Sequence, residues 1–143
     1  MSFNVLIVDD SSSMRAVIKK IIALSGFRMD GCIEAGNGRE GLLALEREWV
    51  DVIISDINMP EMNGLEMLRK LKEHSLYQRI PVIVVSTEGS EERINEAVRC
   101  GAKGFVKKPF LPEDLKKMLH DVLGVDAHGN YDGNQTDADN CDF

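Results

Sequence analysis

The chain has 143 residues, of which 43% are hydrophobic and 29% are charged, and its formal net charge is −7. This composition is ordinary for one globular domain with a sizeable core. The acidic charge argues against non-specific binding to nucleic acid and against binding to an anionic membrane surface.

Two further features narrow the class of protein. The three cysteines, Cys32, Cys100 and Cys141, are widely spaced and indicate neither a disulfide framework nor a zinc site. No apolar stretch is long enough to predict a signal core or a membrane span, so we expect a cytoplasmic protein.

The acidic charge is concentrated near the C-terminus. Five Asp and no Lys or Arg occur from Gly124 onward, so residues 1–123 carry a charge of only −2. The apolar periodicity also stops there. We therefore predict one folded domain over residues 1–123 and an acidic, polar, flexible tail over residues 124–143.

Short apolar runs predict five strands, of which the first, third and fourth are rich in β-branched residues and the second is weaker. They cover residues 5–8, 29–35, 52–54, 82–85 and 104–107. Between and after them, apolar residues recur at the 3.6-residue spacing of amphipathic helices.

Turn and cap residues predict where these helices begin and end. The expected starts are the serines after residue 10, Asn37, Gly64, Ser90 and Pro112. We expect the second helix to bury Leu42, Leu45 and Trp49, and the fourth to bury Ile94, Ala97 and Val98.

Strands that alternate with helices predict an α/β fold, a parallel sheet with five helices distributed over both faces. Polar side chains follow the strands: Asp9 and Asp10 the first, Asp56 the third, Ser86 the fourth and Lys108 the fifth. The carboxyl ends of parallel strands share one rim, where ligands bind. A flavodoxin-like sheet of order 2-1-3-4-5 would place the first and third strands side by side there.

Three converging carboxylates repel one another and need a cation, and Mg²⁺ prefers oxygen ligands of this kind. A carboxylate can act as a nucleophile and form an aspartyl phosphate, for which Asp56 is the central candidate. Mg²⁺ and Lys108 would neutralise charge on the phosphoryl group, and Ser86 would donate to one of its oxygens. Taken singly, an Asp at a strand end is more often a turn residue; the combination favours a site.

Four segments resemble a response-regulator receiver domain of the stand-alone, CheY-like (chemotaxis) type. They are Val-Leu-Ile-Val-Asp-Asp-Ser, Asp-Val-Ile-Ile-Ser-Asp-Ile-Asn-Met-Pro-Glu-Met-Asn-Gly, Val-Ile-Val-Val-Ser-Thr and Gly-Ala-Lys-Gly-Phe-Val-Lys-Lys-Pro-Phe. The resemblance covers residues 3–123 in family order. The family is itself a standard example of the flavodoxin-like sheet.

The resemblance implies a role for each matching residue. Asp56 would be the phosphoacceptor, and Asp9, Asp10, Asp56 and the carbonyl of Asn58 would hold Mg²⁺. Lys108 would bind the phosphoryl group, and its bond to Pro109 would be cis.

The resemblance also implies how the switch is read and reset. Ser86 would be the switch hydroxyl, and Phe105 the aromatic that moves with it. If the last strand is an edge strand, Phe105 and Lys107 share one face of it by the period of two, and that face would belong to the output surface; a lone aromatic on a short strand is more often core. Asn58 and Glu88 would tune attack by water on the phosphoryl group.

These roles imply a signalling switch rather than an enzyme acting on other molecules. Its partners would be a histidine kinase of the chemotaxis type, the flagellar motor switch or another protein target, and a phosphatase, and the protein would be a monomer. A phosphorelay intermediate, a phosphate sink and a regulator of a process other than motility remain open. Two other classes also remain: an aspartyl-nucleophile phosphohydrolase and a flavin-binding module.

The tail allows three interpretations. A solvated acidic segment is the simplest. Some of its residues follow calcium-loop spacing, but His128 replaces the first Asp and Asp139 the last Glu. A third hypothesis is that Cys141 and Phe143 dock on an apolar patch of the domain while the acidic residues meet surface lysines.

Overall fold

The computed structural model describes residues 2–26, 28–87 and 89–124. The predicted tail lies outside these residues except for Gly124, as does Glu88. In the described part of the chain, five strands alternate with five helices. The strands are β1 (Ser2–Val8), β2 (Arg28–Ala35), β3 (Val52–Ser55), β4 (Val82–Ser86) and β5 (Gly104–Lys107). The helices are α1 (Ser12–Leu24), α2 (Gly38–Leu45), α3 (Gly64–Glu73), α4 (Glu91–Arg99) and α5 (Pro112–Leu123).

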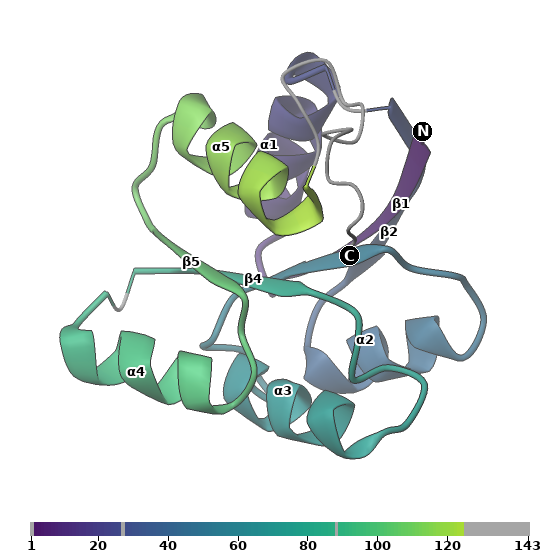
Figure 1. Ribbon diagram of the computed structural model, residues 1–143, viewed down its shortest axis with the longest axis vertical. Helices are drawn as coiled ribbons and strands as arrows, with labels where there is room; N and C mark the ends of the chain where they lie inside the picture. Colours follow the sequence, from purple (N-terminus) through teal and green to yellow (C-terminus); the bar gives the residue numbers. More distant parts are fainter. Residues whose placement is uncertain (1, 27, 88, 125–143) are drawn as a thin grey trace.

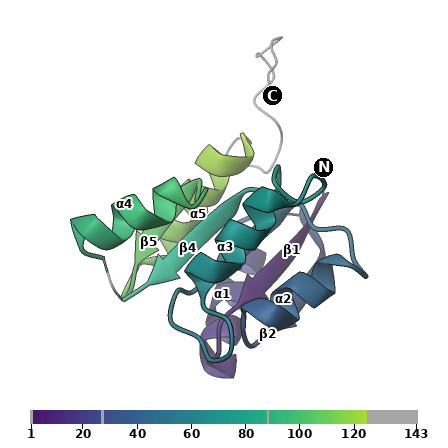
Figure 2. The same cartoon turned by 90° about the horizontal axis from the view of Figure 1, so that it is seen from below.

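The strands form one parallel sheet of order β2-β1-β3-β4-β5, which confirms the predicted flavodoxin-like topology. Helices α1 and α5 cover one face, and α2, α3 and α4 cover the other (Figures 1 and 2). Every residue of β3 and β4 is buried, because these strands lie inside the sheet and between both helical layers. That burial explains their uninterrupted apolar runs.

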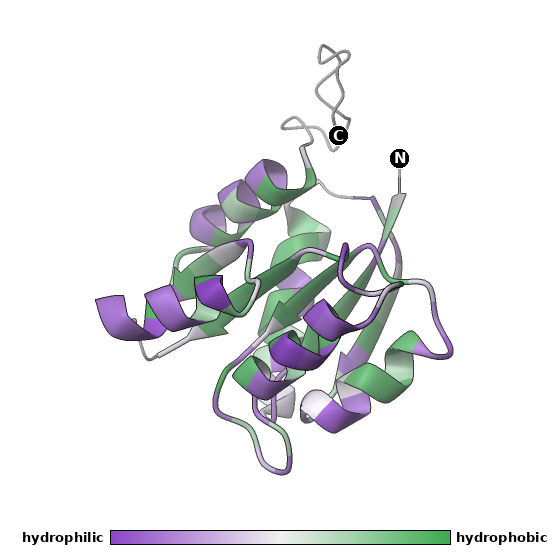
Figure 3. Ribbon diagram, turned by 60° about the horizontal axis from the view of Figure 1, so that its bottom comes forward, coloured by the Kyte–Doolittle hydropathy of each residue, from purple (hydrophilic) through white to green (hydrophobic). Residues whose placement is uncertain are grey.

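Alternate side chains of the strands enter two separate cores. Leu6, Val8 and Ile53 pack beneath α2, α3 and α4, whereas Val5 and Ile7 pack beneath α1 and α5. The hydrophobic residues are concentrated in the strands and the hydrophilic ones on the helices (Figure 3). No helix within the described ranges is long and apolar enough to cross a membrane.

Side-chain caps start four of the helices near the expected positions. Ser11, Asn37, Asn63 and Ser90 each accept a hydrogen bond from the backbone N–H three residues later. These caps satisfy donors that the first turn of a helix leaves free. In a parallel sheet they also place the helix starts at the rim where the strands end.

Two predicted core residues are exposed. Trp49 is 77% exposed because α2 already ends at Leu45, so the residues that follow leave the helical spacing. Val98 is 58% exposed, since α4 packs near the edge of the sheet and Ala97 is its one fully buried residue.

Candidate functional site

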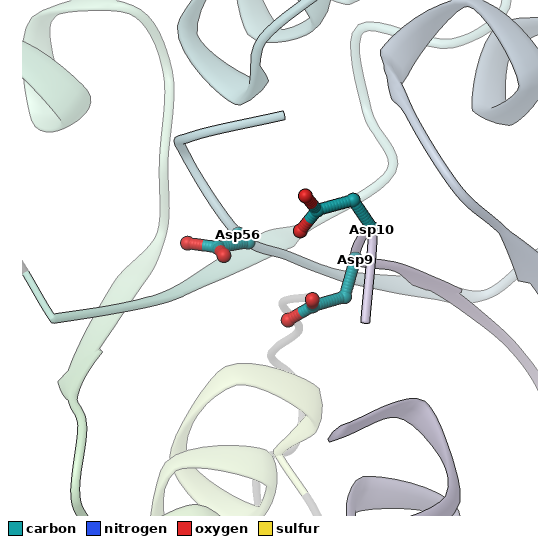
Figure 4. A group of neighbouring side chains, drawn as sticks. All are labelled: Asp9, Asp10 and Asp56. Carbon is teal, nitrogen blue, oxygen red and sulfur yellow. The ribbon is translucent and has the colours of Figure 1, made fainter. Parts of the chain in front are cut away.

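Three carboxylates meet where β1 and β3 end. The Asp9 N–H donates to the carbonyl of Ala35 (3.0 Å) and the Asp56 N–H to that of Val8 (2.9 Å), so both residues continue the strand pairing. Asp9, Asp10 and Asp56 each place one carboxylate oxygen within 4.8 Å of the others (Figure 4). Asp9 is buried, Asp56 is half-buried and Asp10 is exposed, so the cluster opens to solvent on the side of Asp10.

A lysine that directly follows β5 enters the same cluster. Lys108 Nζ lies 3.0 Å from Asp9 Oδ2 and 3.3 Å from Asp56 Oδ2, and the lysine side chain is only 12% exposed. The backbone fixes its position, since its N–H donates to the carbonyl of Ser86 (2.8 Å). Its bond to Pro109 is cis, as expected.

Burial and charge act in opposite directions on this cluster. Burial raises the pKa of Asp56 above its usual value, although the charge of Lys108 and the N–H of Ile57 partly offset the effect. Burial alone would lower the pKa of Lys108, but its contacts with Asp9 and Asp56 outweigh burial and raise that pKa. The lysine therefore stays charged and serves as the counter-ion of the two carboxylates.

The donor set fits a hard divalent cation. It consists of carboxylate oxygens, with neither the sulfur nor the imidazole ligands that zinc favours. The exposed side of the cluster leaves room for the water ligands that Mg²⁺ retains. The resemblance to receiver domains implies a fourth donor, the carbonyl of Asn58, two residues beyond Asp56.

Comparison with known proteins agrees with this geometry. The response regulator receiver domain family matches residues 5–120. The chain belongs to this family. The receiver is 43% identical over 121 residues to a chemotaxis protein CheY homolog of Campylobacter jejuni, an alignment that covers 84% of this chain and 92% of that protein.

Two solved structures show the same architecture. The receiver superimposes on chemotaxis protein CheY4 of Vibrio cholerae with a TM-score of 0.76 and 38% identity, covering 85% of this chain and 99% of that one. It also resembles a CheX–CheY–BeF₃–Mg²⁺ complex from Borrelia burgdorferi, with a TM-score of 0.76, 29% identity and coverage of 85% and 89%. The chain is thus a receiver of two-component signalling similar to CheY proteins.

The remaining predicted residues lie around this cluster and beyond it. Ser86 is completely buried at the end of β4, and Asn58 is exposed in the loop between β3 and α3. Phe105 is half-buried and Lys107 exposed; together with α5 they line a groove of about 400 Å³. Glu88 lies outside the described residues.

The sequence did not point to two residues that shape the receiver's site. Arg15, on α1, donates to the backbone carbonyl of Asp9. Gly64 starts α3 so close to the preceding loop that a Cβ atom there would lie 2.1 Å from the carbonyl oxygen of Asp56. The Asn-Gly pair that contains Gly64 does signal a turn, but an Arg on the polar face of a helix carries no signal.

Proposed function

We propose that this receiver is a phosphorylation-dependent switch that controls chemotaxis and accepts its phosphoryl group on Asp56. The observation that carries the proposal is the Asp9–Asp10–Asp56 cluster with the Lys108 ammonium between two of its members. The similarity to CheY proteins supports chemotaxis as the process, with the flagellar motor switch as the leading target.

In the proposed reaction, a carboxylate oxygen of Asp56 attacks the phosphorus of a phosphohistidine on the partner kinase. The phosphorus–nitrogen bond breaks, its electron pair returns to the imidazole, and an aspartyl phosphate forms. Lys108 already lies against Asp56 and would donate to an oxygen of the transferring group. Its positive charge would stabilise the negative charge that accumulates on the phosphoryl group during transfer.

A divalent cation has a defined place in this scheme. Asp9, Asp10, Asp56 and the carbonyl of Asn58 would hold Mg²⁺, which when bound neutralises charge on the phosphoryl oxygens. The Borrelia relative was crystallised with Mg²⁺ and with BeF₃, and this supports the assignment. Two donors hold the carboxylate of Asp9 in place. Lys108 Nζ donates to Asp9 Oδ2, and the N–H of Ser11 donates to Asp9 Oδ1 at 2.9 Å.

The signal would be short-lived and read by a protein partner. Asn58 is exposed beside the phosphoacceptor and leaves water access, while Glu88 is the second tuning residue. Ser86 and Phe105 would shift together and change the affinity of the surface formed by α4, β5 and α5, which includes Lys107. The Borrelia CheY was solved in complex with CheX, which supports the proposal of a regulatory protein partner such as a phosphatase.

The direct test is incorporation of acid-labile phosphate from acetyl phosphate, with and without Mg²⁺. Asp56→Asn should abolish labelling, whereas Asp121→Asn, which removes an exposed carboxylate on α5, should not change it. Undiminished labelling of Asp56→Asn contradicts the assignment. A wild-type phosphoprotein that persists for hours with Mg²⁺, and returns its phosphoryl group to a histidine protein, would instead favour a phosphorelay.

A further inference from the structure

We infer that Arg15 is a positioning residue for the cation site, which it shapes through the backbone that joins Asp9 to Asp10; the inference rests on the proposed function. Arg15 is in the first turns of α1, and its side chain reaches back over the end of β1. Its Nη1 donates to the carbonyl of Asp9, and its Nε donates to Glu34 Oε1 at 3.0 Å.

The contact with Asp9 fixes a peptide plane. The carbonyl that Arg15 holds belongs to the peptide group between Asp9 and Asp10, so its direction also sets the direction in which the Asp10 backbone continues. The other polar groups of Asp9 are occupied as well, by Ala35, Ser11 and Lys108. Asp10 is exposed, so its carboxylate depends on this backbone for its aim toward Asp9 and Asp56.

The arginine is itself held firmly. Its side chain is only 18% exposed, although it is charged. Its Nη1 also lies close to Gly36, since a Cβ added to Gly36 would be 3.9 Å from this nitrogen. The planar guanidinium thus joins acceptors on two separate segments, the end of β1 and the edge strand β2. A lysine has one nitrogen and no fixed fork, so it cannot reproduce this pair of contacts in the same geometry.

A role through position and a role through charge predict opposite results. A cation beside three carboxylates repels Mg²⁺, so if charge dominated, Arg15→Ala would tighten Mg²⁺ binding. Glu34 balances that charge through its ion pair with Arg15. If Arg15 acts by positioning, Arg15→Ala weakens Mg²⁺ binding, because the Asp9–Asp10 peptide is no longer held.

The experiment is calorimetric titration of the full chain with Mg²⁺ alone. Arg15→Ala should raise the Kd by on the order of 10-fold, the effect typical of losing a residue that orients metal ligands. Arg15→Lys should fall between wild type and Arg15→Ala. Arg69→Ala, which removes an exposed arginine of α3 that pairs with Glu96 at 3.5 Å, should leave the Kd unchanged.

A second measurement uses the metal-free protein. The amide of Asp10 should exchange faster with solvent, and change its chemical shift, in Arg15→Ala but not in Arg69→Ala. Where Arg15→Ala is not folded by circular dichroism, Arg15→Lys decides both measurements. An unchanged or lower Kd for Mg²⁺ in a folded Arg15 variant overturns the inference, and so does an unaltered Asp10 amide. In either case, Mg²⁺ binding by the wild type leaves the proposed function intact. A wild type that binds no Mg²⁺ overturns both.

Discussion

Lys108→Met should destabilise the metal-free protein strongly, because Lys108 is the counter-ion of two carboxylates. Asp9 is 2% exposed and the side chain of Asp56 13%, so both would be left largely out of water without the ammonium. Truncating one partner of a buried ion pair costs about 3–5 kcal/mol. The cluster opens to solvent at Asp10, so we expect the lower end, about 3 kcal/mol of unfolding free energy.

The pH dependence of this loss has a definite sign. The folded-state pKa of Lys108 is raised, so its contribution is complete below the pKa of an unfolded lysine, about 10.4, and is lost as pH rises through the folded value. In Lys108→Met the lowering effect of the lysine on Asp56 disappears, so the pKa of Asp56 rises further. The variant therefore regains stability as pH falls and this carboxyl takes up a proton, and its deficit is greatest near neutral pH.

Mg²⁺ should restore what the lysine supplied, since both neutralise the same carboxylates. A ligand at 100 times its Kd stabilises the folded state by about 2.7 kcal/mol. Urea unfolding with EDTA and with Mg²⁺ measures both effects, and Lys107→Met, the exposed neighbour with the same charge change, is the control. Equal stability of Lys108→Met and wild type in EDTA at neutral pH would refute the counter-ion role.

Three further outcomes are expected. Gly64→Ala should cost about 1–3 kcal/mol in unfolding free energy and slow labelling of Asp56, because the added Cβ meets backbone atoms. Gly31→Ala is the control: its added Cβ meets the side chain of Asn4, with the oxygen at 3.1 Å, so the loss should be smaller. In the metal-free protein the Asp56 carboxyl should take up its proton at a higher pH than an ordinary carboxyl, whose pKa is about 3.9. An Asp56 carboxyl NMR signal that shows no protonation on titration down to about pH 4 contradicts this. Phe105→Ala should weaken partner binding about tenfold, a loss of 1.4 kcal/mol, and leave labelling within about twofold; a loss of labelling would identify Phe105 as plain core.

The fold could be predicted because the parallel sheet imposes a simple pattern. Strands buried on both faces require uninterrupted apolar runs, and β3 and β4 each extend the predicted strand by a single residue. The errors at Trp49 and Val98 have one origin. Periodicity gives the face on which a residue lies, but not where a helix stops or how much of its surface the sheet covers.

The acidic cluster could be predicted for a related reason. Parallel topology brings Asp9, Asp56 and Lys108 to one rim whatever their separation in sequence, and the distances agree with that expectation. Arg15 could not be predicted, because its acceptor is a backbone carbonyl and every residue has one. The close approach of Gly64 depends likewise on the path of two backbone segments, which spacing alone does not reveal.

The arrangement of β4 and β5 suggests how phosphorylation would reach the output surface. The Lys108 N–H donates to the carbonyl of Ser86, and in the same two strands Ser86 pairs with Lys107 and Val84 with Phe105. The residues proposed to sense the phosphoryl group are therefore direct neighbours of those proposed to face the partner. Strand β5 is at the edge of the sheet, so it can shift without breaking a ladder on its other side. A partner that reads this shift must prefer the shifted state, and a population change from 1:99 to 99:1 requires about 5.5 kcal/mol of such preference.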